Sequence, residues 1–282
     1  MTVFGVAARQ ERGDVVRVEV LGERLVEVSV RLPHLAATAL PGQFAQLRCG
    51  DGVQPLLRRP FSVAWAVDDI CSFVVAPVGE GTRRLCALAV GDALDVLGPL
   101  GRGYRLPDDA SNVICVAGGV GCAPFPLLAA RAREGGGAVT VLSGATTERR
   151  LYPAERYQRG DAAIRVVEAT DDGSRGWNGT VVDLVASAMS GGASVYGCGP
   201  NPMLAALAAS LSGGAGLHRA EVSLEAPMGC GFGVCLGCVI PVHSGDAAAP
   251  ASWALCCTDG PVLDITQVDW ERLMALPRAG VA

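Results

Sequence analysis

The sequence predicts a multidomain protein: an antiparallel β-barrel, then a doubly wound α/β domain with a parallel sheet, then a small cysteine-rich module. Between residues 15 and 105, short segments rich in Val, Leu and aromatic residues are separated by Gly and Pro, which is typical of a small barrel. From residue 112 onward, apolar runs alternate with helical segments, which indicates parallel strands buried on both faces. Five cysteines crowd into residues 230–257 and indicate a third unit.

The expected elements follow these patterns in order. Barrel strands are expected at residues 15–20, 25–30, 43–48, 61–65, 70–77 and 92–97. Parallel strands are expected at 113–117, 139–143, 164–169 and 195–198, followed by helices at 124–133, 154–159, 181–189 and 202–211. A short amphipathic helix is expected at 268–276. The three units are therefore expected to span residues 1–106, 107–220 and 221–282.

The composition excludes several classes of protein. All 23 basic residues are Arg, whereas a P-loop, a protein kinase and a pyridoxal enzyme each need a Lys. The net charge of −5 argues against a nucleic-acid partner, and the acidic excess lies within residues 221–282. No apolar run reaches the ~18–20 residues of a membrane-spanning helix. Because residues 1–12 lack a secretory signal, we expect a cytoplasmic protein.

The strongest motif is the spacing of the clustered cysteines. Cys230, Cys235 and Cys238 form a C-x4-C-x2-C run, and Cys257 follows after a further 18 residues. This is the plant-type spacing for a [2Fe–2S] cluster. Glycines at 231, 233 and 237 allow the tight bend that turns three thiolates toward one cluster. A zinc site is the alternative, although zinc sites usually use two separated knuckles and only one is present here. Cys256 and Cys257 both remain candidates for the fourth ligand.

A second motif combines a strand end with a Gly-rich turn. Its members are Arg59, Pro60, Phe61 and Ser62, with Gly81 and Thr82 downstream. An Arg fork, a hydroxyl and the exposed amides of a Gly-Thr turn can hold a diphosphate, and Phe61 could lie against a flavin ring. Taken alone, the simpler interpretation is an ordinary Arg at a strand end.

Two further turns follow expected parallel strands. They contain Gly118, Gly119 and Gly121 in the first turn, and Cys198, Gly199 and Pro200 in the second. Glycines before a helix let a pyrophosphate approach the backbone and the helix N-terminus. A small Cys at a strand end would let a nicotinamide ring come close, since ligands of open α/β sheets sit there. The glycines do not form G-x-G-x-x-G, and an ordinary strand-to-helix turn is the alternative for the second site.

The order of these motifs resembles the ferredoxin reductase superfamily. A closer resemblance, to the electron-transfer subunits of NAD-dependent dihydroorotate dehydrogenase, covers about residues 10–265. It is carried by Glu225-Ala-Pro-Met-Gly-Cys230 and the cysteine run after it, and by Cys257-Thr-Asp-Gly-Pro261. Thr170-Asp-Asp-Gly-Ser174 and Gly98-Pro-Leu-Gly101 add to it. In that family the fourth cluster ligand directly precedes x-Asp-Gly-Pro, which selects Cys257.

The resemblance implies cofactors and a partner. It implies FAD on residues 59–62, 81 and 82, a [2Fe–2S] cluster on the four cysteines, and NAD over residues 118–121 and 198–200. The implied partner is an FMN-containing catalytic subunit that oxidises dihydroorotate in pyrimidine biosynthesis, in a heterotetramer. Electrons would run from FMN through the cluster and FAD to NAD.

This sequence departs from the family pattern at one place, and it does not decide between NAD and NADP. Ala76 and Pro77 stand where the family often has a Tyr-Arg pair, so Arg83 and Arg84 are candidates for the missing phosphate contact. Arg149 and Arg150 follow the second parallel strand, where a 2′-phosphate binds in related folds, so NADP stays open beside NAD.

Two other functions are consistent with the sequence. The same flavin and iron–sulfur module could serve another partner, such as a hydrogenase, a glutamate synthase or a ferredoxin-type complex. The alternative of another class is a zinc-stabilised binding protein without redox activity. The intact motifs at 59–62 and 118–121 argue against that alternative.

Overall fold

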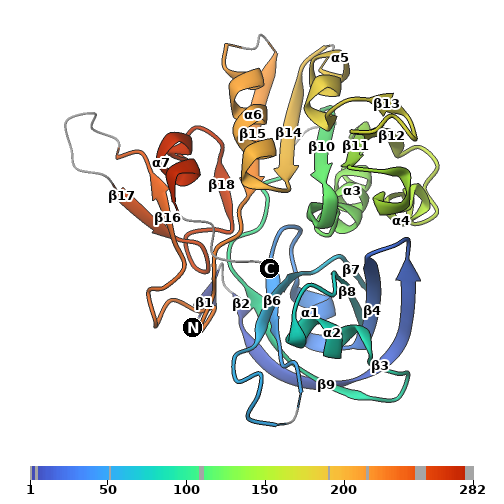
Figure 1. The fold of residues 1–282 in the computed structure, drawn as a ribbon, viewed down its shortest axis with the longest axis vertical. Helices are drawn as coiled ribbons and strands as arrows, with labels where there is room; N and C mark the ends of the chain where they lie inside the picture. Colours follow the sequence, from blue (N-terminus) through green and yellow to red (C-terminus); the bar gives the residue numbers. More distant parts are fainter. Residues whose placement is uncertain are drawn as a thin grey trace.

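Two seven-stranded sheets organise the chain, with a smaller cysteine-rich unit beside them (Figure 1). The computed structural model describes residues 2–3, 6–50, 52–107, 111–189, 191–213, 216–244 and 252–276. Within these residues no helix combines the length and the apolar character needed to cross a bilayer. The longest helix has 11 residues.

The first sheet is antiparallel and curls into a half-barrel, called the barrel below. Its spatial order is β6-β5-β9-β3-β4-β8-β7. The strands are β3 (Arg9–Leu21), β4 (Leu25–Arg31), β5 (Phe44–Leu47), β6 (Arg59–Ser62), β7 (Trp65–Val67), β8 (Ile70–Val75) and β9 (Ala93–Leu100). The helices α1 (Pro33–Thr38) and α2 (Glu80–Cys86) complete the unit, and β1 (Thr2–Val3) pairs with β2 (Val6–Ala7) before it. Because β6 and β7 stand at opposite edges and only residues 63 and 64 separate them, the edges of the sheet are drawn together.

The expected single strand over residues 61–65 is wrong, because the chain changes sheet edge there. Val63 N–H donates to Gln43 O at 3.0 Å, whereas Ala64 N–H donates to Ser72 O at 2.9 Å. The first bond holds the chain beside β5, and the second holds it beside β8. Val63 thus bonds on the β5–β6 side of the sheet, whereas Ala64 bonds on the β7–β8 side.

The second sheet is mainly parallel, as the alternating pattern predicted. Its order is β13-β12-β11-β10-β14-β15-β18. The strands are β10 (Val113–Gly118), β11 (Val139–Ala145), β12 (Arg165–Thr170), β13 (Trp177–Asn178), β14 (Ala193–Cys198), β15 (Leu217–Ser223) and β18 (Val262–Asp264). Every residue of β10 and of β14 is buried, because helices cover both faces of the sheet.

The helices divide between the two faces of this sheet. They are α3 (Phe125–Glu134), α4 (Ala154–Gln158), α5 (Val185–Ala188) and α6 (Asn201–Leu211). Leu204 and Val185 pack with Ile114 and Val116 on one face. Phe125 of α3 and Tyr157 of α4 pack with Val113 and Cys115 on the other. The domain is therefore doubly wound.

The cysteine-rich unit is joined to both larger units. It contains the antiparallel pair β16 (Val239–Val242) and β17 (Ser252–Leu255), and the helix α7 (Trp270–Ala275). Its strand β18 extends the parallel sheet by pairing antiparallel with β15. Arg102, just after β9, forms an isolated bridge with Pro261. The third unit therefore has fixed positions against the barrel and the parallel sheet.

Candidate functional site

The four predicted cluster cysteines lie in two pairs. Cys238 Sγ lies 3.1 Å from Cys257 Sγ, and both residues are buried. Cys230 and Cys235 are nearer the surface, and the Cys235 N–H donates to Cys230 Sγ at 3.5 Å. Among the described residues, no three His, Cys, Asp or Glu side chains are gathered tightly enough to hold one metal ion. The two pairs are nevertheless near each other, because, besides burial and Cys238, the charge of Cys230 contributes to raising the pKa of the Cys257 thiol.

The backbone of this loop supplies donors to sulfur. Besides the Cys235 amide, the Cys257 N–H is directed at Cys238 Sγ, 3.4 Å away. Gly231 and Gly233 adopt φ values of 84° and 85°, a left-handed conformation that glycine adopts without strain and that turns the loop back on itself. Amides aimed at thiolate sulfurs are the second layer of contacts that iron–sulfur clusters use. The donor set thus fits the predicted cluster.

The pKa values of the Cys230 and Cys257 thiols are shifted in opposite directions. Burial opposes ionisation of Cys230, but the N–H groups of Cys235, Phe232 and Val234 outweigh burial and lower the pKa of this thiol to about 6. At Cys257, burial and then the neighbouring Cys238 raise the pKa to about 12. Cys230 is therefore closer than Cys257 to the thiolate form that a metal requires.

Cys256 points away from the other thiols. Its Sγ donates to Leu224 O at 3.3 Å, and its side chain is fully buried in the core. Burial also raises the pKa of the Cys256 thiol. Of the two candidates for the fourth ligand, Cys257 brings its Sγ to Cys238 Sγ, whereas Cys256 meets Cys238 through its backbone N–H, which donates to Cys238 O at 2.8 Å.

The two halves of the predicted flavin site meet at the barrel edge. Arg59, Pro60, Phe61 and Ser62 form β6 and are all half-buried. A Cβ placed on Gly81 would lie 3.1 Å from Cys49 Sγ and 3.6 Å from Arg59 Cγ. The Thr82 hydroxyl lies 2.9 Å from the Gly79 N–H and donates to Gly79 O at 3.0 Å, which closes the first turn of α2. The structure therefore brings the Arg strand and the Gly-Thr turn together.

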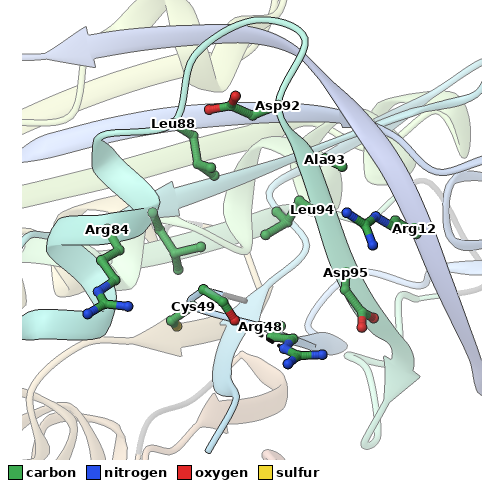
Figure 2. A pocket seen from close by; sticks show the side chains of 11 residues that line it. Arg12, Arg48, Cys49, Arg84, Leu88, Asp92, Ala93, Leu94 and Asp95 are labelled. Atoms are coloured by element: carbon green, nitrogen blue, oxygen red, sulfur yellow. Dashed lines mark hydrogen bonds between the residues drawn. The ribbon is translucent and has the colours of Figure 1, made fainter. Parts of the chain in front are cut away.

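A pocket of about 280 Å³ opens beside this contact. Figure 2 shows Arg84 from α2 and Arg12 from β3 on opposite sides of it, with Cys49 and Arg48 between them. Arg84 Nε pairs with Glu80 at 2.8 Å, and its Nη1 donates to Gln54 O at 2.9 Å. Of the two candidates for the missing phosphate contact, Arg84 lines this pocket and Arg83 does not.

The glycine turn and the Cys-Gly-Pro turn lie against each other at the ends of β10 and β14. Ala117 pairs with Cys198 across these parallel strands. A Cβ on Gly121 would stand 2.3 Å from Cys198 O, and a Cβ on Gly118 would stand 2.3 Å from Met203 Sδ. The close approach leaves room for glycine alone at residue 121. Residues 118–121 and 198–200 thus border one place at the carboxyl edge of the sheet, where ligands of such sheets bind.

The residues considered for a 2′-phosphate follow β11. Arg150 Nη1 donates to Thr146 Oγ1 at 3.3 Å, and its Nε lies 3.8 Å from Glu23 Oε2. The Arg149 carbonyl accepts from Glu23 N–H at 2.9 Å. Glu23 therefore ties this segment to the barrel.

Sequence reasoning missed Glu225 as a site residue. It follows β15, in which Ser223 pairs with Cys198. Glu225 is exposed at the surface, but the protein packed around it removes water from its carboxyl group and raises the pKa of that group. Burial, and then the nearby Glu225 charge, raise the pKa of the Cys198 thiol. One sequence feature could have identified Glu225: it lies just beyond the end of a parallel strand, at the sheet edge where the other predicted ligand turns lie.

Comparison with known proteins identifies the family. Residues 225–269 match the model for the iron–sulfur cluster binding domain of dihydroorotate dehydrogenase B. The dihydroorotate dehydrogenase B (NAD(+)) electron transfer subunit of Desulforamulus reducens is 38% identical over 244 residues, covering 85% of this chain and 90% of the relative. The same subunit of Geobacillus thermodenitrificans is 36% identical over 267 residues, covering 92% and 98%.

Solved structures show the same fold. One, from work on flavin-based electron bifurcation by an NADH-dependent reduced ferredoxin-NADP oxidoreductase, has a TM-score of 0.80 at 27% identity and covers 93% of this chain and 91% of that one. The ferredoxin reductase of carbazole 1,9a-dioxygenase has a TM-score of 0.63 at 25% identity, covering 74% and 66%. With the sequence matches running over most of both chains, this protein belongs to the family of electron transfer subunits of NAD-dependent dihydroorotate dehydrogenase B.

Proposed function

We propose that this protein carries electrons between NAD and a catalytic partner that oxidises dihydroorotate, by way of FAD and a [2Fe–2S] cluster on one chain. Residues 1–106 would hold FAD, residues 107–220 NAD, and residues 221–282 the cluster. The family membership supports the reaction, and the geometry of the three units supports the route. The eleven free cysteines fit the reducing conditions of the cytoplasm.

One contact carries the proposal: the cluster loop packs against the flavin strands. A Cβ on Gly231, next to Cys230, would lie 2.3 Å from Gln46 Nε2. Gln46 belongs to β5 and pairs with Pro60 of β6, within the predicted flavin motif. The predicted flavin and cluster sites are therefore neighbours in space although about 170 residues separate them in sequence. Direct electron transfer needs this proximity.

The chain's own residues divide the work of binding. The Arg59 fork and the turn at Gly81 and Thr82 would hold the FAD diphosphate, with Arg84 and Arg48 adding positive charge at the adjoining pocket. Glycines 118, 119 and 121 would admit the NAD pyrophosphate. Because burial raises the pKa of Cys198, its thiol stays neutral at pH 7 and places no charge where the nicotinamide would lie.

FAD, when bound, supplies the exchange between the electron pair of a nicotinamide hydride and the single electrons of a cluster. Electrons would reach the partner through the cluster loop. Cys235 is exposed there, and its neighbours Val234 and Leu236 are 72% and 62% exposed. Exposed apolar residues beside a redox centre fit a docking surface for the FMN-bearing partner in a heterotetramer.

The experiment measures visible absorption and electron transfer under anaerobic conditions. NADH is expected to bleach both a flavin band and the cluster absorption of the purified protein. Cys235→Ser is expected to keep NADH-driven flavin reduction and to lose dihydroorotate-dependent NAD reduction when the catalytic subunit is added. Cys86→Ser, a change at a half-buried thiol of α2, serves as the control and should retain both.

The outcomes separate the competing functions. Normal transfer to the partner by Cys235→Ser would remove the cluster from the route. Zinc in place of iron, with no response to NADH, would support the zinc-stabilised binding protein. A protein that NADH reduces but that passes electrons only to ferredoxin would support the second candidate, which the 0.80 TM-score to the ferredoxin-NADP oxidoreductase structure favours.

A further inference from the structure

Gln46 is fully buried, and neither end of its carboxamide has a partner. The residue is 0% exposed, and both Nε2 and Oε1 lack a hydrogen bond in the described structure. A buried amide without partners costs about 1–3 kcal/mol, which is why such groups are nearly always satisfied in folded proteins. Its partner is therefore to be sought among groups that the chain itself does not supply.

The side chain of Gln46 faces the cluster unit rather than the barrel interior. Along β5, Ala45 and Leu47 belong to the barrel core, whereas Phe44 belongs to the hydrophobic cluster that also contains Cys238 and Cys257. Because side chains alternate along a strand, Gln46 shares the face of Phe44. The contact with Gly231 agrees, since a Cβ there would meet Gln46 Nε2 at 2.3 Å and Cδ at 2.9 Å.

Gln43 is a second buried glutamine, and its side-chain hydrogen bonds can be compared with those of Gln46. It lies three residues earlier and is 2% exposed. Its Oε1 accepts from Leu40 N–H at 2.9 Å, and its Nε2 donates to Gly101 O at 2.9 Å. Both ends of its carboxamide are satisfied by backbone. Gln46 has no such partners, so its carboxamide is available to bond a group that is not part of the protein chain.

We propose that Gln46 Nε2 donates a hydrogen bond to a sulfur atom of the iron–sulfur cluster and thereby raises the cluster's reduction potential; this inference rests on the cluster site proposed above. The donor end is the relevant one, because thiolate and sulfide sulfurs accept hydrogen bonds and cannot donate them. Reduction adds one electron and negative charge to the cluster, so a donor N–H stabilises the reduced form more than the oxidised form. Gln46 is a positioning residue that influences the equilibrium of electrons between the flavin and the cluster.

The first test compares Gln46→Met with the wild-type protein. Met fills nearly the same volume and removes the N–H donor. The variant is expected to retain wild-type iron, sulfide and FAD contents. At a fixed potential, its ratio of reduced to oxidised cluster should fall about tenfold, equivalent to ~59 mV for a one-electron couple. The flavin couple is expected to stay unchanged. The ratio is read from the EPR signal of the reduced cluster during a redox titration.

The matched control is Gln43→Met. This change removes two hydrogen bonds to backbone, so it should lower the melting temperature and leave the cluster ratio unchanged. A second measurement needs no variant. Wild-type protein labelled with ¹⁵N in its glutamine side chains should show a weak ¹⁵N coupling to the reduced cluster in pulsed EPR.

Each outcome decides the proposal. Unchanged titration of Gln46→Met would overturn it, as would a shift of the flavin couple alone, which would place the carboxamide on the flavin. If Gln46→Met fails to fold or loads no cluster, the labelled wild-type protein decides, and absence of a ¹⁵N coupling overturns the proposal. A wild-type protein without iron and sulfide would overturn the proposed function as well, whereas the other failures leave that function standing.

Discussion

Glu27 Oε2 accepts a hydrogen bond from Arg159 Nη2 at 2.8 Å, across the boundary between the barrel and the parallel sheet. Glu27 lies on β4 and is only 2% exposed, whereas Arg159 follows α4 (Figure 1). The Tyr152 hydroxyl donates to the same carboxylate at 3.3 Å, and Arg156 Nη1 lies 3.6 Å from Glu27 Oε1. One buried carboxylate thus accepts two hydrogen bonds from the neighbouring domain and forms an ion pair with a second arginine there.

Removing the charge of Glu27 is expected to loosen this boundary. Glu27→Gln leaves the largely buried Arg159 guanidinium without its counter-charge, whereas Arg156 keeps its ion pair with Glu19. Breaking a buried pair costs about 3 kcal/mol of unfolding free energy. Urea unfolding measures the loss. The control is Glu134→Gln, in an exposed pair with Arg131, where about 0.5 kcal/mol or less is expected. Equal losses in the two variants would show that Glu27 does not join the domains.

Replacing each of the two adjacent cysteines in turn tests which one is the fourth cluster ligand. Cys257→Ala is expected to abolish cluster binding, since its Sγ is the one that meets Cys238 Sγ at 3.1 Å. Cys256→Ala should lose about 1 kcal/mol of stability through the small cavity it leaves, and keep the cluster. Iron and acid-labile sulfide per chain measure both. Retention of the cluster by Cys257→Ala would transfer the ligand role to Cys256.

The crowding around Gly81 predicts a selective loss of FAD affinity. In Gly81→Ala, the new methyl lies 3.1 Å from Cys49 Sγ and 3.2 Å from Cys49 Cβ, so the turn must shift relative to Arg59. We expect FAD to bind about tenfold more weakly, a difference of ~1.4 kcal/mol. Gly79→Ala is the control, because nothing lies within 4 Å of a Cβ there. Fluorescence titration of the apoprotein compares them, and equal affinities would argue against a diphosphate at this turn.

Glu225 predicts a pH dependence of stability. Burial raises its carboxyl pKa above the ordinary 4.5, so the folded protein keeps this proton to higher pH than the unfolded chain does. Between the two pKa values the folded state binds more protons, and rising pH therefore lowers the free energy of unfolding. Glu225→Gln removes that loss, so its stability relative to wild type should increase as pH rises from about 4 toward 7.

Urea unfolding at several pH values makes this comparison. Glu155→Gln, on the exposed side of α4, supplies the effect of removing an exposed carboxyl group. A difference between Glu225→Gln and wild type that stays constant over this pH range would mean that Glu225 ionises alike in both states.

The sequence predicted elements whose pattern is local and missed those that distant segments decide. The strands β10 and β14 were predictable because strands covered on both faces read as continuous apolar runs. The division of residues 61–65 between two strands was not, because it depends on hydrogen bonds to Gln43, just before β5, and to Ser72 of β8. The pairing of β18 with β15 joins Asp264 to Glu221, and no propensity within either segment encodes it.

The same distinction holds at the candidate site. The cysteine spacing predicted which thiols bind the cluster, but it could not distinguish Cys256 from Cys257 as the fourth ligand. Adjacent residues differ mainly in the direction of their side chains, which spacing alone does not give. The structure separates them through the bond from Cys256 Sγ to Leu224 O. Gln46 carried no signal in sequence, since a Gln within a strand is ordinary. Its importance comes from the absence of a partner for its carboxamide in the described structure.

The pairing of β18 with β15 also has a consequence for synthesis on the ribosome. β18 begins at Val262, beyond the last cluster cysteine, so the parallel sheet cannot gain its final strand until the whole cysteine loop has emerged. Until then β15 is an open edge that can pair with another nascent chain. A product terminated before residue 262 would leave the edge of β15 permanently unpaired. If the cysteine unit were grafted onto another protein, its strand β18 would no longer have β15 to pair with. The parallel sheet can therefore be completed only after all four predicted cluster cysteines have left the ribosome.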